Sequence, residues 1–324
     1  MTMLVLCDHD RGTLVDASLE ALTFGRDLAT RAGVSCEAVV IGKGAEEAAG
    51  QLAAYGATVV HLASHEVLTD FGPEAWGETL AQLVASSGAS IVTACGTDRG
   101  NEVLAHVAAR LDEPFVANCR EVDPSDDTWS MTRVQWGGSL LEDVTLAAGH
   151  KIVSVAHHAV EAAPASEPAA GTVTAFSPDL DASLARTVVT DRVVLSRGIT
   201  LATAPVVVGG GRGVGSAEAF APLEELAAEL GGVVGCSRAV TNNGWRPHSD
   251  QVGQTGTRIA PQVYIASGIS GAIQHWVGAM ASKHILAINT DREANIVVRA
   301  DWAVIGDLHK VIPAITEEVR RRRN

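Results

Sequence analysis

Aromatic residues make up only 4% of the 324 residues, and basic residues are few, with 24 Lys and Arg against 38 Asp and Glu. The formal net charge of −14 argues against a nucleic-acid-binding protein, because such proteins need a basic surface for the phosphates. The one basic run, residues 320–323, is typical of a solvated helix end. No uninterrupted apolar run approaches the roughly 20 residues that a membrane-spanning helix needs.

Cysteine is also scarce. The five cysteines, Cys7, Cys36, Cys95, Cys119 and Cys236, are widely scattered and form no Cys-x-x-Cys pair. This spacing predicts free thiols in the core of a protein from a reducing compartment. The apolar start of the chain is too short for a signal peptide and is followed at once by acidic residues, so we expect a cytoplasmic protein.

Motifs for metal or nucleophilic catalysis are missing as well. His61 has a second His four residues later, but the Glu follows that second His, so H-E-x-x-H is absent. His157 and His158 are adjacent on a candidate strand, where we expect them to point to opposite faces and to form no chelate. Residues 268–272 depart from G-x-S-x-G at the last Gly, and the next His is too close for the triad of that fold.

What is present is the pattern of two α/β domains. Hydrophobic residues reach 47% and charged residues 19%, enough for two sizeable cores. Strands that alternate with helices predict a doubly wound parallel sheet covered on both faces. In the first half we expect strands at 3–7, 38–41, 58–63 and 90–94, and helices at 15–32, 45–55, 79–85 and 101–111.

The end of the first domain is less regular. Residues 115–155 are rich in strand signals, and further strands are expected at 172–176 and 187–195. We place the join near residue 197, which gives an N-terminal α/β domain over 1–197 and a second domain over 198–324.

The second domain repeats the doubly wound pattern. Val206-Val207-Val208 precedes a glycine-rich loop and a helix expected over 217–230, which is a phosphate-cradle pattern without the strict G-x-G-x-x-G spacing. Further strands are expected at 233–236, 264–269, 284–288 and 303–305, with helices at 271–280 and 308–320. Loops at the carboxyl ends of parallel strands should face one crevice.

Residues 264–275 look like the centre of a binding site. An apolar run from Tyr264 ends in small residues, and Ser270 and Gly271 stand where a helix N-terminus presents unpaired N–H groups and partial positive charge. His275 follows inside that helix. Backbone donors, hydroxyls, amides, one Arg and one His suit a polar, anion-bearing cofactor better than a metal.

These residues resemble the alpha subunit of electron transfer flavoprotein, closely over about residues 205–316 and more loosely at 100–112 and 135–138. The resemblance is carried by Ser237-Arg238-Ala239, Gln251-Val252-Gly253-Gln254-Thr255-Gly256, Ala260-Pro261, Gly268-Ile269-Ser270-Gly271-Ala272-Ile273-Gln274-His275, Ala287-Ile288-Asn289 and Gly306-Asp307-Leu308.

The resemblance implies a C-terminal, Rossmann-like FAD-binding domain. Its cofactor-binding residues are then Arg212, Ser237, Arg238, Val252, Gly253, Gln254, Thr255, Ser270, Gly271, Ala272, Ile273, Gln274, His275, Asn289, Asp307 and Leu308.

Three of these residues are expected to tune the flavin. The resemblance implies that Arg238 lies against the ring, where a fixed cation raises the reduction potential. The Thr255 hydroxyl is expected near ring atom N5. His275 is expected near the C2 carbonyl and N1, where negative charge collects on reduction.

The other contacts have simpler alternatives. Arg212 is expected on the pyrophosphate, although a solvated loop Arg explains it equally well without the resemblance. Asn289 and the pair Asp307-Leu308 are expected at the ribose or adenine end. A turn at Asn289 and a helix cap at Asp307 are plausible instead.

The resemblance predicts the FAD-carrying alpha subunit of a heterodimer, an electron carrier without its own organic substrate. It would accept electrons from flavin dehydrogenases and pass them to a redox acceptor, and its first domain would be the platform for a beta subunit that holds AMP or a second FAD. Two alternatives stay open: an NADH-oxidising, electron-bifurcating complex, and a redox-inactive nucleotide-binding scaffold. The chain departs from the family pattern at Thr257-Arg258, at Arg292 to Asn295 and at His248-Ser249, beside the site.

Overall fold

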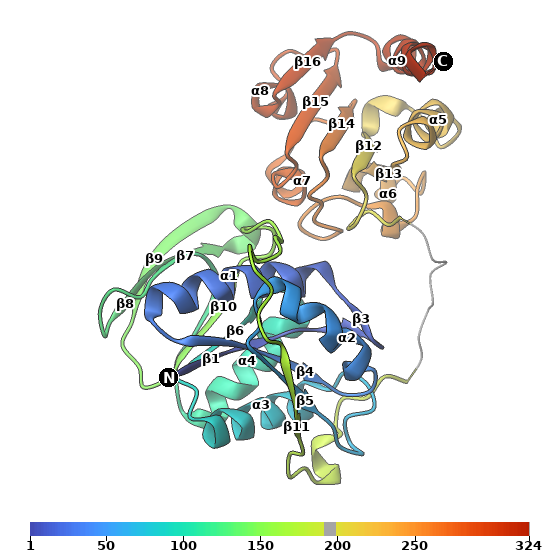
Figure 1. Cartoon of the computed structure of the whole chain (residues 1–324). Coiled ribbons are helices and arrows are strands. Elements are labelled where there is room, and N and C mark those ends of the chain that lie inside the picture. Colours follow the sequence, from blue (N-terminus) through green and yellow to red (C-terminus); the bar gives the residue numbers. More distant parts are fainter. Residues whose placement is uncertain (191–198, 324) are drawn as a thin grey trace. The chain divides into compact units, whose positions relative to one another are not determined.

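The computed structural model describes residues 1–190 and 199–323. The chain divides into two compact units, Met1–Val193 and Val194–Asn324, and each is described by itself (Figure 1). The strand predicted over 187–195 is absent at residues 187–190. Its remaining residues, like the predicted join near residue 197, lie outside the described residues.

The first unit is built on a nine-stranded mixed sheet. The strand order is β11-β5-β4-β1-β6-β10-β7-β8-β9, and every pairing is parallel up to β7. The strands are β1 (Thr2–Leu6), β4 (Ser35–Ile41), β5 (Val59–Ala63), β6 (Ile91–Cys95), β7 (Phe115–Asp123), β8 (Trp129–Gln135), β9 (Leu140–Leu146), β10 (Lys151–Val155) and β11 (Thr172–Phe176).

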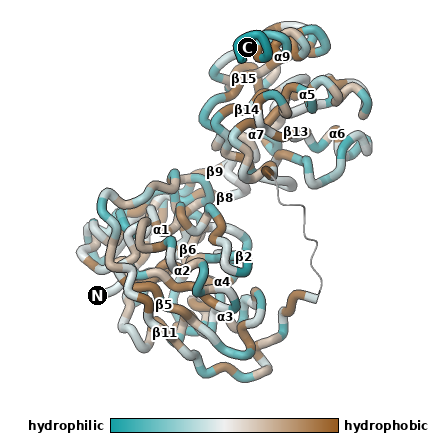
Figure 2. Tube along the Cα trace, turned by 45° about the vertical axis from the view of Figure 1, so that its right-hand side comes forward, coloured by the Kyte–Doolittle hydropathy of each residue, from teal (hydrophilic) through white to brown (hydrophobic). Residues whose placement is uncertain are grey.

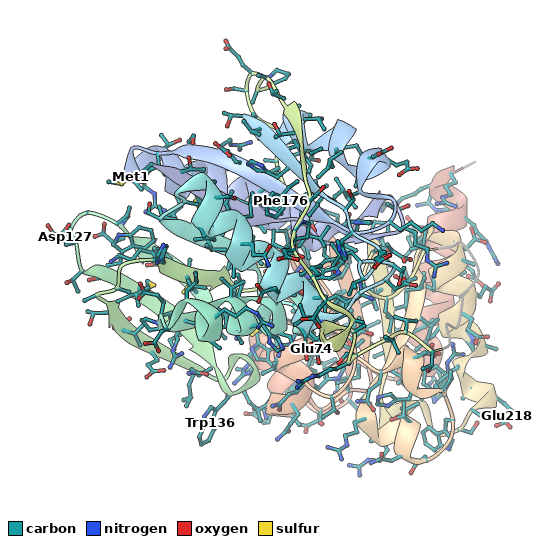
Figure 3. All side chains as sticks on the ribbon, turned by 90° about the horizontal axis from the view of Figure 1, so that it is seen from below. Met1, Glu74, Asp127, Trp136, Phe176 and Glu218 are labelled. Carbon is teal, nitrogen blue, oxygen red and sulfur yellow. The ribbon has the colours of Figure 1, made fainter. Side chains whose placement is uncertain are left out.

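The prediction of a doubly wound parallel sheet does not hold at one end of this unit, within the less regular region 115–155, because β8 and β9 run antiparallel. Only residues 124–128 separate β7 from β8, which is too short for the crossover that a parallel neighbour requires. The chain therefore folds back as hairpins. The side chain of Trp136, between β8 and β9, projects away from the ribbon (Figure 3) and is 77% exposed.

Two hydrophobic cores cover the two faces of this sheet. Side chains alternate along β1, so Met3 and Val5 join one core and Leu4 and Leu6 the other. The first core is shared with α1 (Asp16–Ala32) and α2 (Ala45–Leu52), and the second with α3 (Pro73–Ser87) and α4 (Asp98–Leu111). The remaining short elements are β2 (His9–Asp10), β3 (Thr13–Leu14), η1 (Ala53–Tyr55), η2 (Trp136–Gly138) and η3 (Ala182–Leu184).

Proline sets the start of two helices. Helix α3 begins at Pro73, well before the predicted residue 79, because a proline is favourable in the first turn. The helix predicted over 217–230 is instead a 3₁₀ turn, η5 (Glu218–Phe220), followed by α5 (Ala221–Glu229). Pro222 fits the first turn of α5 but not a helix interior, so the regular helix starts there.

The second unit is a five-stranded sheet with parallel pairings throughout, in the order β13-β12-β14-β15-β16. Helices α5 and α9 share one core with this sheet, and α7 and α8 share the other. The hydropathy colouring shows that α9 ends in hydrophilic residues (Figure 2). The elements are β12 (Val206–Gly210), β13 (Val233–Cys236), β14 (Val263–Ser267), β15 (His284–Asn289), β16 (Trp302–Ile305), α6 (Arg238–Asn242), α7 (Ile273–Ala279), α8 (Asn295–Arg299), α9 (Leu308–Arg323), η4 (Arg212–Val214) and η6 (His248–Asp250).

Across the described residues, no helix is both long and apolar enough to cross a membrane. All five cysteines are buried and free, as their spacing predicts.

Candidate functional site

The predicted site residues of the second unit gather around one edge of its sheet. Because the five strands are parallel, their carboxyl ends lie at the same edge. The chain runs from β12 to β13 on one side and then returns to β14 on the other, so the strand order reverses between β12 and β14. Such a reversal opens a crevice at the carboxyl ends of the strands.

The glycine loop after β12 is locked to the loop after β14. The N–H of Gly211 donates to the Ser267 carbonyl at 2.9 Å, and that of Gly213 donates to the Gly268 carbonyl at 3.0 Å. A Cβ on Gly211 would lie 2.2 Å from the Gly268 oxygen, so only glycine permits this approach. Arg212 lies between these two contacts and is exposed.

The end of β13 supplies a hydroxyl and a cation. The N–H of Ser237 donates to the Gly210 carbonyl at 3.0 Å, which holds the two strand ends together. Arg238 begins the short helix α6 and is exposed, and it makes no ion pair with any described residue. Its charge is therefore available to an anionic or electron-accepting group at this edge.

Residues 252–256 form a loop against the start of α7. The N–H of Gln254 donates to the Gln274 carbonyl at 2.7 Å, and a Cβ on Gly253 would lie 2.9 Å from that carbonyl oxygen. The Val252 N–H continues the pairing with β13 by donating to the Cys236 carbonyl at 2.9 Å. This packing brings the predicted Gln-Thr pair next to the predicted helix start.

The Thr255 hydroxyl is oriented by a buried amide. The Gln251 side-chain nitrogen donates to Thr255 Oγ1 at 2.9 Å, and the Gln251 oxygen accepts from the Thr241 hydroxyl at 2.7 Å. Because Thr255 Oγ1 accepts this bond, its own hydrogen is left to donate. Thr255 and Gln254 are both exposed.

The turn after β14 presents a row of backbone donors. Gly268 and Gly271 have φ angles of 63° and 75°, the left-handed region that favours glycine. Within the described residues, the N–H groups of Ser270, Gly271 and Ala272 make no backbone hydrogen bond. Helix α7 starts at Ile273 instead of the predicted residue 271, so Ile273 and Gln274 are its first residues and their N–H groups have no partner inside it.

His275 is buried beneath this turn, with 7% of its surface exposed. Its Nε2 lies 2.8 Å from the Tyr264 hydroxyl, the only hydrogen bond of this ring among the described residues. Burial lowers the pKa of His275 to about 4, while the nearby Val252 carbonyl opposes this shift without meeting the geometry of a hydrogen bond to Nδ1. His275 is therefore a neutral imidazole at pH 7.

The tautomer of His275 follows from its partner. Burial raises the pKa of the Tyr264 hydroxyl, which stays protonated and has to donate its hydrogen. Donation to His275 Nε2 leaves the ring hydrogen on Nδ1. Nδ1 is then a buried donor without a partner, which is unfavourable in the isolated chain and suits an acceptor on a bound group.

The remaining predicted contact residues mainly stabilise the local structure. The Asn289 side-chain nitrogen donates to the Ile269 carbonyl at 2.8 Å and so holds the turn after β14. Asp307 Oδ1 accepts from the His309 N–H at 3.0 Å, which is the helix cap considered above as the simpler alternative. Leu308 is buried, and its side chain fills the space beside Gly268.

Sequence reasoning missed two buried polar residues, Gln251 and Tyr264. Gln251 opens the motif around Thr255, so its position next to that motif was a usable signal. Tyr264 was assigned only to a strand, and nothing in the sequence links it to His275 eleven residues later. A contact of this kind depends on how α7 packs against β14.

The expectation that His157 and His158 point to opposite faces is wrong. Strand β10 ends at Val155, and the two residues lie in the turn that follows. Their rings stack with centroids 3.7 Å apart.

Comparison with known proteins gives consistent matches over most of the chain. Residues 3–181 match the family model "Electron transfer flavoprotein domain", and residues 200–280 match "Electron transfer flavoprotein FAD-binding domain". The chain is 37% identical over 326 residues to the electron transfer flavoprotein subunit alpha of Mycobacterium tuberculosis, covering 99% of both chains.

Two further relatives come from other organisms. The subunit alpha of Thermoanaerobacterium thermosaccharolyticum is 32% identical over 320 residues, covering 98% of this chain and 97% of that protein. Protein FixB of Bradyrhizobium diazoefficiens is 34% identical over 339 residues, covering 98% and 88%.

Proposed function

The chain belongs to the electron transfer flavoprotein alpha-subunit family, and on that premise we propose that it is the FAD-carrying subunit of an electron-transferring heterodimer. A beta subunit is the partner that this family implies. The proposal includes flavin dehydrogenases as donors, a separate redox acceptor, and AMP or a second FAD in the beta subunit. The observation that carries it is the family match over the second unit, at whose sheet edge the predicted binding residues meet.

The residues present fit a dinucleotide with an anionic pyrophosphate and a ring that carries hydrogen-bond acceptors. Unpaired N–H groups at residues 270–274 and the exposed Arg212 suit the anion. The unpartnered Nδ1 of His275 suits a ring carbonyl. These features support a Rossmann-like FAD domain over residues 198–324.

FAD, when bound, supplies a ring that takes up one or two electrons. This chain's residues set how readily it does so. The fixed positive charge of Arg238 would favour added electrons on the ring, and the Thr255 hydroxyl would be free to donate to a ring nitrogen. His275 acts as a neutral donor through Nδ1, because its pKa of about 4 keeps it uncharged at pH 7.

The experiment is to purify the chain with its partner subunit, denature the complex, and identify and count the released small molecules. One FAD with one AMP per heterodimer is the expected result. Two FAD would move the proposal to the bifurcating complex. A complex without flavin at any stage would contradict FAD binding by this chain and leave the nucleotide-binding scaffold.

A further inference from the structure

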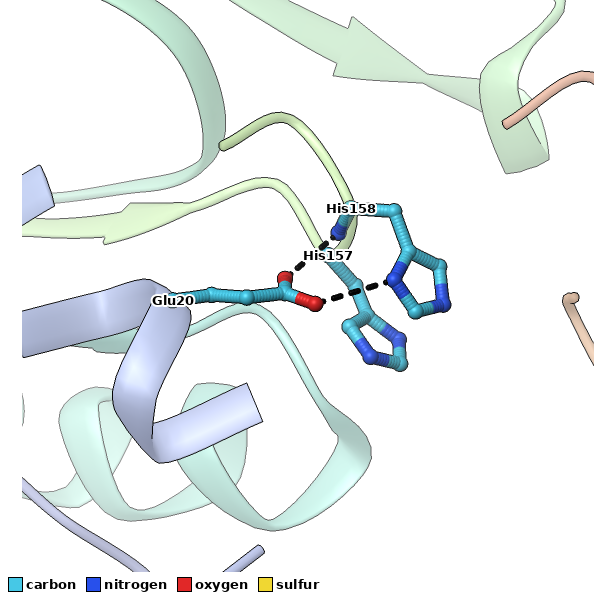
Figure 4. Close-up of side chains that lie close together, drawn as sticks. All are labelled: Glu20, His157 and His158. Atoms are coloured by element: carbon cyan, nitrogen blue, oxygen red, sulfur yellow. Dashed lines mark hydrogen bonds and ion pairs between the residues drawn. The ribbon is translucent and has the colours of Figure 1, made fainter. Parts of the chain in front are cut away.

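A second cluster of polar side chains lies in the first unit, on a turn that the flavin site does not include. Glu20 on α1 meets His157 and His158 in the turn after β10 (Figure 4). The turn is closed by a bond from the Ala159 N–H to the Ala156 carbonyl at 3.0 Å. His158 has a φ of 63°, which is costly for a residue other than glycine and has to be offset by its contacts.

Glu20 holds His158 by two hydrogen bonds. One carboxylate oxygen accepts from the His158 backbone N–H at 2.8 Å, and the other lies 3.0 Å from the ring Nδ1. Both side chains are nearly enclosed, with 9% of Glu20 and 12% of His158 exposed. Among the described residues, no Lys or Arg forms an ion pair with this buried carboxyl group.

The two imidazoles stack on each other, with an interplanar angle of 25°. The ring centroids are 3.7 Å apart, which brings the nitrogens of both rings close to the Glu20 carboxylate. A carboxylate together with imidazole nitrogens is a donor set that zinc-class metals accept.

We propose that Glu20, His157 and His158 form a binding site for one divalent transition metal ion of the zinc class. One ligand atom from each residue lies within 4.8 Å of the other two. The 3.0 Å between Glu20 and His158 Nδ1 is close to the roughly 3.3 Å that separates two tetrahedral ligands about 2 Å from zinc. The metal replaces the proton between them, and three protein ligands leave a fourth position for water.

Proton balance is simple at this site. If His158 is neutral, its hydrogen moves from Nδ1 to Nε2 and no proton is released. If it carries a hydrogen on both ring nitrogens, the Nδ1 hydrogen leaves to water as the metal binds. Parallel stacked rings do not aim two lone pairs at one point, so His157, which is half-buried, turns out of the stack when it becomes the third ligand.

The test uses the tag-free heterodimer stripped of metal with a chelator and titrated with Co²⁺, a spectroscopic substitute for zinc, and then with Zn²⁺ in competition. We expect one equivalent of Co²⁺ with the visible absorption of a four-coordinate site. Glu20→Gln and His157→Gln should each weaken binding by at least about tenfold, since changes outside the ligand set already cost 10–100-fold. His150→Gln is the matched control, because His150 pairs with Glu113 in the same unit outside the cluster.

Circular dichroism and thermal unfolding of each variant show whether it folds. If Glu20→Gln does not fold, His157→Gln decides alone, because His157 is half-buried and is not part of the Glu20–His158 clamp. Absence of stoichiometric binding by the wild-type complex overturns the proposal. So does unchanged affinity in His157→Gln, or equal loss of affinity in His150→Gln.

Discussion

The pair formed by Tyr264 and His275 is the most consequential contact at the scale of single residues. Both side chains are buried, and each gives the other its only hydrogen bond within the described part of the chain. The tyrosine fixes which imidazole nitrogen carries the hydrogen, and so decides whether Nδ1 donates or accepts. Tyr264, inside the core, thereby determines the hydrogen-bonding role of His275 at the sheet edge.

Replacing Tyr264 with Phe should destabilise the second unit by about 1–3 kcal/mol, because His275 Nε2 is then buried without a partner. Denaturant unfolding of the flavin-free chain measures the change. Tyr55→Phe is the control, because the hydroxyl that it removes makes no hydrogen bond with the described residues. It should change the free energy of unfolding by no more than about 0.5 kcal/mol. Equal effects of the two substitutions would contradict this role for Tyr264.

His275 also makes stability depend on pH. Its pKa is about 4 in the folded chain and 6.5 without the effect of burial. Between these values the unfolded chain binds a proton that the folded chain does not. Above pH 6.5, protonation of His275 does not lower the free energy of unfolding. As the pH falls from 6.5 to 4, the free energy of unfolding decreases by up to about 3 kcal/mol.

The measurement is the free energy of unfolding of the wild type and of His275→Gln at several pH values from 7 to 4. The difference between the two proteins should change by this amount across the window. A difference that is constant with pH would show that His275 titrates normally in the folded chain.

At the scale of elements, the loops after β12 and β14 are held together because their backbones are in direct contact. Two hydrogen bonds join them, and Gly211 leaves no space for a side chain. The loops therefore move together, and the exposed Arg212 and the N–H groups near Ser270 keep a fixed spacing. Binding of a two-part anion such as a pyrophosphate benefits from such preorganisation.

Gly211→Ala should destabilise the second unit by about 1–3 kcal/mol and weaken flavin binding, because the new Cβ would lie 2.2 Å from a backbone oxygen that cannot move freely. Gly50→Ala is a contrasting control. Gly50 is exposed inside α2 with nothing within 4 Å of its Cβ position, so alanine should stabilise the first unit by about 0.5–1 kcal/mol. Thermal unfolding and flavin content distinguish the two outcomes.

At the scale of the whole molecule, the proposed flavin site belongs entirely to the second unit, whereas the Glu20 cluster belongs to the first. A ligand that binds only the folded form stabilises what it binds, by about 2.7 kcal/mol at a hundred times its dissociation constant. Removal of FAD from the heterodimer should therefore increase amide exchange in β12, β14 and α7. The core strands β1 and β6 should be unaffected, as hydrogen-exchange mass spectrometry would show; equal changes in both units would contradict separate stabilisation.

Much of this organisation is predictable from sequence. Strand and helix alternation predicts the parallel core of each unit, because strands buried on both faces read as short apolar runs such as residues 3–7. The motifs around Ser237, Thr255 and Ser270 predict which loops gather at the second sheet edge. Strands β8 and β9 are antiparallel because the connection between β7 and β8 is short. The length of that connection could not be predicted, because sequence patterns locate strand ends poorly.

What sequence could not predict depends on contacts between distant segments. Glu20 and His158 are 138 residues apart, and neither stands in a recognisable metal motif. The turn that brings His157 and His158 together exists because β10 ends at Val155, before the histidines. Side-chain direction in such a turn is set by φ angles and packing, not by the period of two along a strand.

The strand order of the second sheet also bears on how the chain folds during its synthesis. From β14 onward, each new strand joins the sheet beside the strand made immediately before it, so β15 and then β16 extend an edge that already exists. Helix α9 follows the last of these strands, and its Arg320 reaches back to Glu225 and Glu229 of α5. A nascent chain can therefore assemble this sheet strand by strand before α9 docks on it.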